Sequence, residues 1–89
     1  MNRSEEILTI LQEECAEVIQ AVSKIKRFGM FHNMENLHKE LADLQCMIDL
    51  SYEYILVSAD PADIFMKIAE KREKLKIYSK IFEETAETT

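Results

Sequence analysis

Two pairs of acidic residues lie where amphipathic helices should present apolar side chains. Glu14 and Glu17 are three positions apart, and so are Glu40 and Asp43. Residues three, four and seven positions apart share one face of a helix, and apart from Glu17 the neighbours of Glu14 on that face are apolar: Ile7, Ile10, Leu11, Val18 and Ala21. Burying an unpaired carboxylate is costly, so two such pairs on facing helices predict a bound cation. Oxygen ligands without Cys or His favour a hard ion, with Mg²⁺ as the first choice and Mn²⁺ as the second.

Three helices are expected to carry these residues. The one Gly and the one Pro of the chain, Gly29 and Pro61, mark two breaks, and the segments between them have helical periodicity. We predict helices over residues 4–27, 34–57 and 61–82, and each is preceded by a suitable N-cap residue: Asn2 or Ser4, Asn33, and Asp60. The predicted fold class is therefore all-α, with a three-helix protomer.

The short loop around Gly29 predicts that the first two helices form an antiparallel hairpin. With the turn centred near residue 30 and a rise of about 1.5 Å per residue, Glu17 and Asp43 are level. Glu14 then lies about one turn above them and Glu40 about one turn below, so the four carboxylates are expected to converge. The alternative is that they are half-exposed acids at a wet interface, because long charged side chains at the edge of an apolar stripe often extend to solvent.

Composition limits the remaining possibilities. A chain of 89 residues holds one domain, which we place at residues 1–82, followed by an acidic tail, residues 83–89, that we expect to fray. The formal net charge of −6 argues against binding to a nucleic-acid polymer, and no apolar run is long enough to span a membrane. Two cysteines form no disulfide framework, which favours a cytoplasmic location, and Cys15, whose helical neighbours are apolar, is expected to be buried. A core this small favours a helical bundle completed by homo-oligomerisation.

The two acidic pairs also carry a resemblance to a known family. Glu14-Cys15-Ala16-Glu17, followed after 22 residues by Glu40-Leu41-Ala42-Asp43, resembles the ExxE…ExxD signature of the MazG-like all-α nucleoside triphosphate pyrophosphohydrolases. The likeness covers residues 5–57, and the third helix is more loosely similar to the short, phage-type members. The resemblance implies Mg²⁺-dependent hydrolysis of a (d)NTP to a (d)NMP and pyrophosphate by a homodimer or homotetramer. It also implies that the four acids are the catalytic metal ligands, since carboxylate-held Mg²⁺ neutralises phosphate charge and activates water.

Basic residues are the candidates for contact with the phosphates of the substrate. Lys24 and Arg27 follow the acidic pair of the first helix, and Lys71, flanked by Lys74, interrupts the apolar stripe of the third. An ammonium group binds phosphate as a point charge, and the alternatives for Lys71 are extension to solvent at the edge of the bundle and pairing with Glu70. Asn36, one turn before the acidic pair of the second helix, is a candidate to hold a ligand water or to cap the motif, with a plain surface position as the alternative.

One rival interpretation comes from a different class of protein. A small helical dimerisation or nucleotide-binding module without catalysis explains the chain length, the amphipathic stripes and the acidic charge. It does not explain why four acids occupy two facing stripes. The presence of all four signature acids therefore favours the enzyme.

Overall fold

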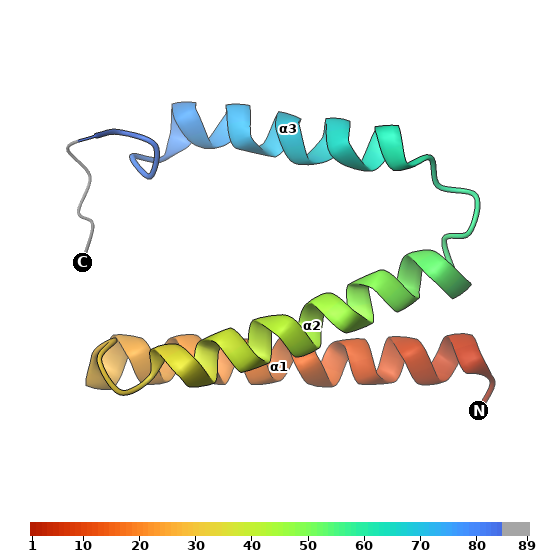
Figure 1. The fold of residues 1–89 in the computed structure, drawn as a ribbon, viewed down its shortest axis with the longest axis horizontal. Coiled ribbons are helices and arrows are strands. Elements are labelled where there is room, and N and C mark those ends of the chain that lie inside the picture. Colours follow the sequence, from red (N-terminus) through yellow and green to blue (C-terminus); the bar gives the residue numbers. More distant parts are fainter. Residues whose placement is uncertain (85–89) are drawn as a thin grey trace. The chain divides into compact units, whose positions relative to one another are not determined.

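The computed structural model of the protein describes residues 1–84. Within this range the chain forms three α-helices and no strand: α1 (Arg3–Phe28), α2 (Met34–Tyr54) and α3 (Pro61–Tyr78) (Figure 1). The predicted all-α class is thus confirmed for the protomer. Of the tail that was predicted to fray, residues 85–89 lie outside the described range. None of the described helices is long and apolar enough to cross a membrane.

Side-chain caps define the starts of α1 and α3, as predicted. The backbone N–H of Glu5 donates a hydrogen bond to Asn2 Oδ1 at 2.8 Å, and that of Ala62 donates to Asp60 Oδ1 at 3.0 Å. Pro61 occupies the first turn of α3, where the N–H that it lacks would have no helical partner. Each cap provides an acceptor for a helix N-terminal N–H group, which is why these residue types marked the boundaries in the sequence.

Helices α2 and α3 each end about one turn before the predicted position. After α2, the N–H groups of Ile55 and Leu56 both donate to Ser51 O at 2.9 Å, and the regular helical bonding stops there. After α3, Ser79 is extended and its Oγ accepts a hydrogen bond from the N–H of Ile81 at 3.0 Å. A side-chain turn of this kind offers the backbone an alternative to the helix.

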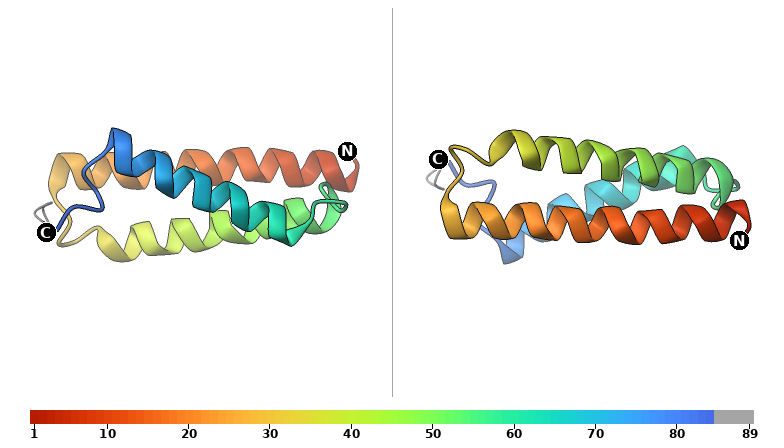
Figure 2. Two further views of the ribbon diagram at one scale, coloured as in Figure 1. Left: turned by 90° about the horizontal axis from the view of Figure 1, so that it is seen from above. Right: turned by 90° about the horizontal axis from the view of Figure 1, so that it is seen from below.

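Residues 1–57 form one compact unit, a helical hairpin in which α1 and α2 lie side by side and antiparallel (Figures 1 and 2). The loop turns at Gly29, whose φ of 91° is rarely adopted by residues with a side chain. Asn33 is the N-cap residue of α2, as predicted, but its side chain makes no capping hydrogen bond and instead donates to Gly29 O at 2.8 Å, which braces the loop. The loop runs back along the end of α1, so α2 begins beside the last turn of α1 rather than beyond it (Figure 2).

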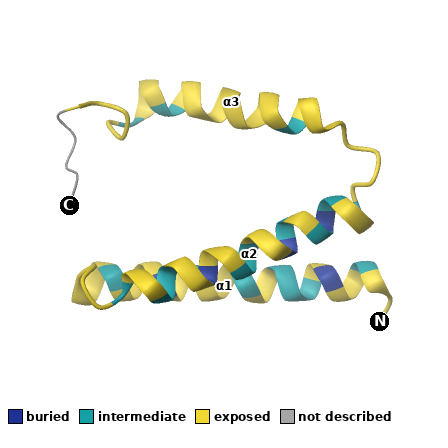
Figure 3. Ribbon diagram, in the orientation of Figure 1, coloured by how far each residue is buried: buried dark blue, intermediate teal, exposed yellow. Residues whose placement is uncertain are grey.

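The core of the hairpin is thin. In the part of the chain that the structure describes, the buried apolar residues are Ile7, Ala21 and Met47. Two polar residues, Glu40 and Ser51, are buried in the same helical stripe as Met47 (Figure 3). Ser51 Oγ donates to Met47 O at 2.7 Å and is therefore satisfied within its own helix. Glu40, by contrast, is an acidic side chain buried in a small apolar core, which is an unusual position for a charged group.

A second apolar face of α1 is not covered by α2. Leu8, Ile19 and Val22 on this face are 48%, 66% and 38% exposed, and Cys15 among them is exposed as well. The prediction that Cys15 is a buried thiol is therefore wrong for the protomer, because its apolar neighbours lie on the uncovered face. The single chain leaves a continuous apolar strip along α1 in contact with water.

A second compact unit begins at Ser58 and contains α3. This helix has no buried residue, and ion pairs among the described residues on its surface join Lys67 to Asp63 and Lys76 to Glu73, each at 2.7 Å. Because the described chain divides into two units, the single domain predicted for residues 1–82 stays a prediction.

Candidate metal centre

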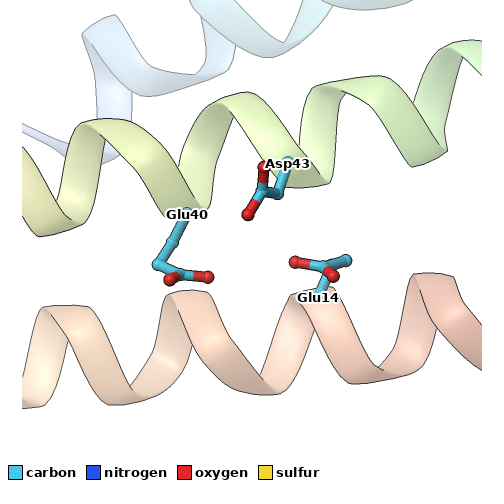
Figure 4. Close-up of side chains that lie close together, drawn as sticks. All are labelled: Glu14, Glu40 and Asp43. Carbon is cyan, nitrogen blue, oxygen red and sulfur yellow. The ribbon is translucent and has the colours of Figure 1, made fainter.

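Three carboxylates from the two helices of the hairpin converge at one point. Among residues 1–84, Glu14 of α1 and Glu40 and Asp43 of α2 each offer one oxygen, and these oxygens all lie within 4.8 Å of one another. The three side chains extend into the space between the helices and toward one another (Figure 4). Glu40 is buried, with 9% of its surface exposed, and Glu14 and Asp43 are half-buried. We call Glu14, Glu40 and Asp43 the acidic cluster.

The spacing of residues along each helix explains why the cluster faces inward. Glu14 lies seven residues from Ile7 and seven from Ala21, both of which are buried. Glu40 lies seven residues before Met47, which is also buried. Residues seven apart share a helix face, so these acids occupy the contact face of the hairpin rather than its periphery.

Of the four predicted ligands, Glu17 is the one that does not join this group in the described structure. It lies on the exposed surface of α1, one turn from Glu14 toward the hairpin loop. The predicted register had Glu17 level with Asp43, whereas the carboxylate that meets Asp43 is that of Glu14. The difference arises at the loop, which folds back along α1 and so displaces α2 along the hairpin (Figure 2).

Electrostatic repulsion within the cluster acts on the pKa of Glu14. Burial raises the pKa of the Glu14 carboxyl above its ordinary value, and the negative charges of Asp43 and Glu40 raise it further. The charge of Lys39 opposes this rise, and that of Glu17 adds to it. A positive ion among these oxygens would reverse the effect, because it stabilises the charged form of each carboxyl group.

Lys39 contacts the cluster, although the sequence analysis had not singled it out. Its Nζ donates a hydrogen bond to Asp43 Oδ2 at 2.8 Å and lies 3.6 Å from Glu40 Oε1. The hydrogen bond to Asp43 and the charges of Asp43 and Glu40 raise the pKa of the Lys39 ammonium. The signal for this contact was present in the sequence, since a Lys and an Asp four positions apart are neighbours on a helix.

The donor set of the cluster fits a hard divalent cation. All three groups are carboxylates, which are preferred ligands of Mg²⁺ and Mn²⁺, whereas softer metals favour other ligand types. Mg²⁺ holds its oxygen ligands at about 2.1 Å, so oxygens on opposite sides of the ion are about 4.2 Å apart. The oxygens of the cluster lie within 4.8 Å of one another, which is slightly more than this spacing. The acidic cluster could therefore hold a metal ion.

The predicted substrate-binding residues lie in both units. Lys24 and Arg27 are exposed near the end of α1, where the Arg27 guanidinium stacks over the Phe28 ring at 5.1 Å from its centre. Asn36 is half-buried one turn before Glu40 on α2. The last two predicted residues are exposed on α3, in the second unit: Lys71 and Lys74.

An antiparallel helical hairpin with carboxylates converging from both helices defines an all-α protein with a candidate site for a hard cation. The family of the MazG nucleotide pyrophosphohydrolase domain matches residues 2–55, which contain α1, α2 and all four predicted acids. The match spans more than half of the chain, and the protein belongs to this family. The resemblance seen in the sequence is thus confirmed, and at the level of the family the activity is that of a nucleotide pyrophosphohydrolase. The comparisons with curated proteins and with solved structures found no match.

Proposed function

We propose that the protein is a Mg²⁺-dependent nucleoside triphosphate pyrophosphohydrolase. In the proposed reaction, water cleaves the phosphoanhydride between the α- and β-phosphates of a ribo- or deoxyribonucleoside triphosphate, and the products are the monophosphate and pyrophosphate. The observation that carries the proposal is the convergence of Glu14, Glu40 and Asp43 within 4.8 Å, inside the segment that matches the family. Three acids on the contact face of a thin hairpin core destabilise the fold unless they serve a cation.

The acids have distinct parts in this proposal. Glu14, Glu40 and Asp43 bind the ion between the helices, and Glu17, exposed one turn along α1, is the fourth ligand on the solvent side. When bound, Mg²⁺ supplies positive charge against the phosphates and lowers the pKa of a coordinated water. The protein contributes the placement of the carboxylates, because Glu40 is buried on the contact face of the hairpin.

The basic and amide side chains then bind the rest of the substrate. Lys24 and Arg27 are accessible on α1, on the side of the hairpin loop, and we assign them to the phosphate chain. Asn36, next to Glu40 on the face of α2, is assigned to a water of the metal site. Lys71 and Lys74 are assigned to phosphate contacts from α3.

We also propose that the active form is a homodimer or homotetramer, in which the helices of several protomers form a bundle. The support is the apolar strip of α1, with Ile19 66% exposed, together with a core in which the described chain buries only Ile7, Ala21 and Met47 among its apolar residues. Exposed apolar patches of this kind on small proteins mark interaction surfaces. A second copy of the chain supplies a matching surface by symmetry.

The test is a product analysis with a matched pair of variants. The purified protein is incubated with each ribo- and deoxyribonucleoside triphosphate and Mg²⁺, and monophosphate plus pyrophosphate is resolved from diphosphate plus phosphate. Glu40→Gln removes one charge from the cluster, whereas Glu53→Gln makes the same change at an exposed position of α2. We expect pyrophosphate release by the wild type and by Glu53→Gln, and a loss of at least about a hundredfold in Glu40→Gln.

Other outcomes separate the proposal from its rivals. Release of phosphate instead of pyrophosphate would assign a different bond to the site. No turnover of any nucleotide with Mg²⁺ or Mn²⁺, by a folded oligomer, would favour the non-catalytic dimerisation or nucleotide-binding module.

A further inference from the structure

The Lys39 ammonium contacts two of the three carboxylate groups that the proposed metal ion requires. Its Nζ is 2.8 Å from Asp43 Oδ2 and 3.6 Å from Glu40 Oε1, and both oxygens belong to side chains of the acidic cluster. The Lys39 side chain is otherwise open to water, with 68% of its surface exposed. The contact therefore arises from charge and spacing and not from packing.

A divalent cation and an ammonium group make incompatible demands on the same carboxylate. The lone pair of Asp43 Oδ2 that accepts the hydrogen bond from Lys39 is directed at Nζ, so a metal that approaches this oxygen from the same side competes with the ammonium. A positive charge next to the site also repels an incoming cation. By contrast, Lys39 reduces the repulsion among the carboxylates when no metal is bound, because its positive charge lies against two of them.

We infer that Lys39 is an internal competitor of the divalent cation, which must displace the ammonium from Asp43 in order to bind. This inference rests on the proposed function. In this role, Lys39 lowers the affinity of the acidic cluster for the metal below the value that the carboxylates alone would give. The metal then binds in exchange for an existing ion pair, so that occupancy depends on the free concentration of the ion.

A positioning role for Lys39 predicts the opposite sign. If the hydrogen bond served mainly to hold Asp43 in the geometry for metal binding, then removing Lys39 would weaken the affinity for metal. If Lys39 served only the substrate phosphates, then its removal would leave the affinity for metal unchanged. The direction of the change in metal affinity therefore decides among the three roles.

The experiment is a titration of the full chain with Mn²⁺ alone, without nucleotide, with free Mn²⁺ measured by electron paramagnetic resonance. Lys39→Met removes the charge and keeps most of the stem, Lys39→Arg keeps the charge, and Lys76→Met removes a Lys that pairs with Glu73 at 2.7 Å on α3. Because the Lys39 charge is solvated, we expect Lys39→Met to bind Mn²⁺ on the order of tenfold more tightly than the wild type. Lys39→Arg and Lys76→Met should bind like the wild type.

Unchanged or weaker binding in Lys39→Met, in a protein with wild-type helical content, would overturn the inference. The proposed function has a separate readout in the same titration, since Glu40→Gln should lose Mn²⁺ binding. If the wild type binds Mn²⁺ through Glu40 and Lys39→Met binds no more tightly, only the role of Lys39 is refuted. If the wild type itself binds no Mn²⁺, the proposed metal centre fails, and the role of Lys39 fails with it.

Discussion

Replacing Glu40 by Gln should have opposite effects on stability without and with Mg²⁺. The oxygens of Glu40 and Asp43 lie within 4.8 Å of each other, and two unit charges at that distance repel by about 0.9 kcal/mol even at the dielectric constant of water, which suits the partly exposed Asp43. Glu14 adds a repulsion of the same sign, and Lys39, 3.6 Å from Glu40, offsets part of the total. Without metal, Glu40→Gln should therefore stabilise the fold by roughly 0.5 kcal/mol, which raises the Tm of a domain of this size by about 2–4 °C.

With Mg²⁺ the order should reverse. At a free concentration one hundred times its Kd, a ligand that binds only the folded protein stabilises it by about 2.7 kcal/mol. The wild type should show this gain and overtake the variant, because Glu40→Gln has lost a ligand. The assay is thermal melting followed by circular dichroism, in EDTA and in MgCl₂, with NaCl added to match the ionic strength.

The matched control is Glu53→Gln, which changes an exposed carboxylate on the same helix. It should melt like the wild type under both conditions. The reasoning is refuted if Glu40→Gln melts below the wild type in EDTA, since the carboxylate would then stabilise the fold without a cation. It is equally refuted if the variant keeps the full response to Mg²⁺.

Three further perturbations test other parts of the structure. The raised pKa of Glu14 means that the folded protein binds the proton of this carboxyl more tightly than the unfolded chain does. In EDTA, the free energy of unfolding should therefore rise as the pH falls through the raised pKa, and it should level off below the ordinary value of 4.5. In urea titrations, Glu14→Gln should lose this pH dependence, and the control variant Glu13→Gln should keep it. Ala21 is 1% exposed in the hairpin, so Ala21→Leu should lower the free energy of unfolding by about 1–3 kcal/mol. The larger side chain should also separate the helices and weaken Mn²⁺ binding, and tighter binding of Mn²⁺ would contradict the close packing of Ala21. Ile19→Lys places a charge on the apolar strip of α1 and should shift sedimentation toward the protomer, and an unchanged sedimentation coefficient would place the oligomer interface elsewhere.

Local signals in the sequence account for most of the fold. Asn2 and Asp60 indicate the starts of their helices because a capping hydrogen bond needs only the side chain of the cap residue and an N–H of the following turn. The C-terminal ends were predicted less well, since nothing in the apolar periodicity reveals that the Ser79 hydroxyl forms a turn with the N–H of Ile81. The apolar periodicity of the sequence therefore predicts the approximate length of each helix, whereas particular hydrogen bonds decide where the helix ends.

The candidate site was predictable in composition and less so in geometry. The anomaly of Glu14 and Glu40 on apolar faces is a property of spacing alone, and both residues do lie on the contact face. Which acids meet across the hairpin depends on how the loop after Gly29 runs, and the side-chain bond from Asn33 that braces this loop cannot be read from periodicity. The register of α2 against α1 therefore places Glu14 next to Asp43, and Glu17 lies on the exposed side of α1.

The acidic cluster also has a consequence for the unfolded chain. Its members on α1 and α2 are 26 residues apart in the sequence, from Glu14 to Glu40. A cation held by both helices is therefore a cross-link that closes a loop, as a disulfide does, and loops of this length lose on the order of 3–4 kcal/mol of chain entropy in the simple loop-closure account. Unlike a disulfide, this cross-link forms and dissolves with the concentration of a free ion and needs no oxidant. In the proposed metal-bound form, the hairpin would thereby gain a reversible cross-link between α1 and α2.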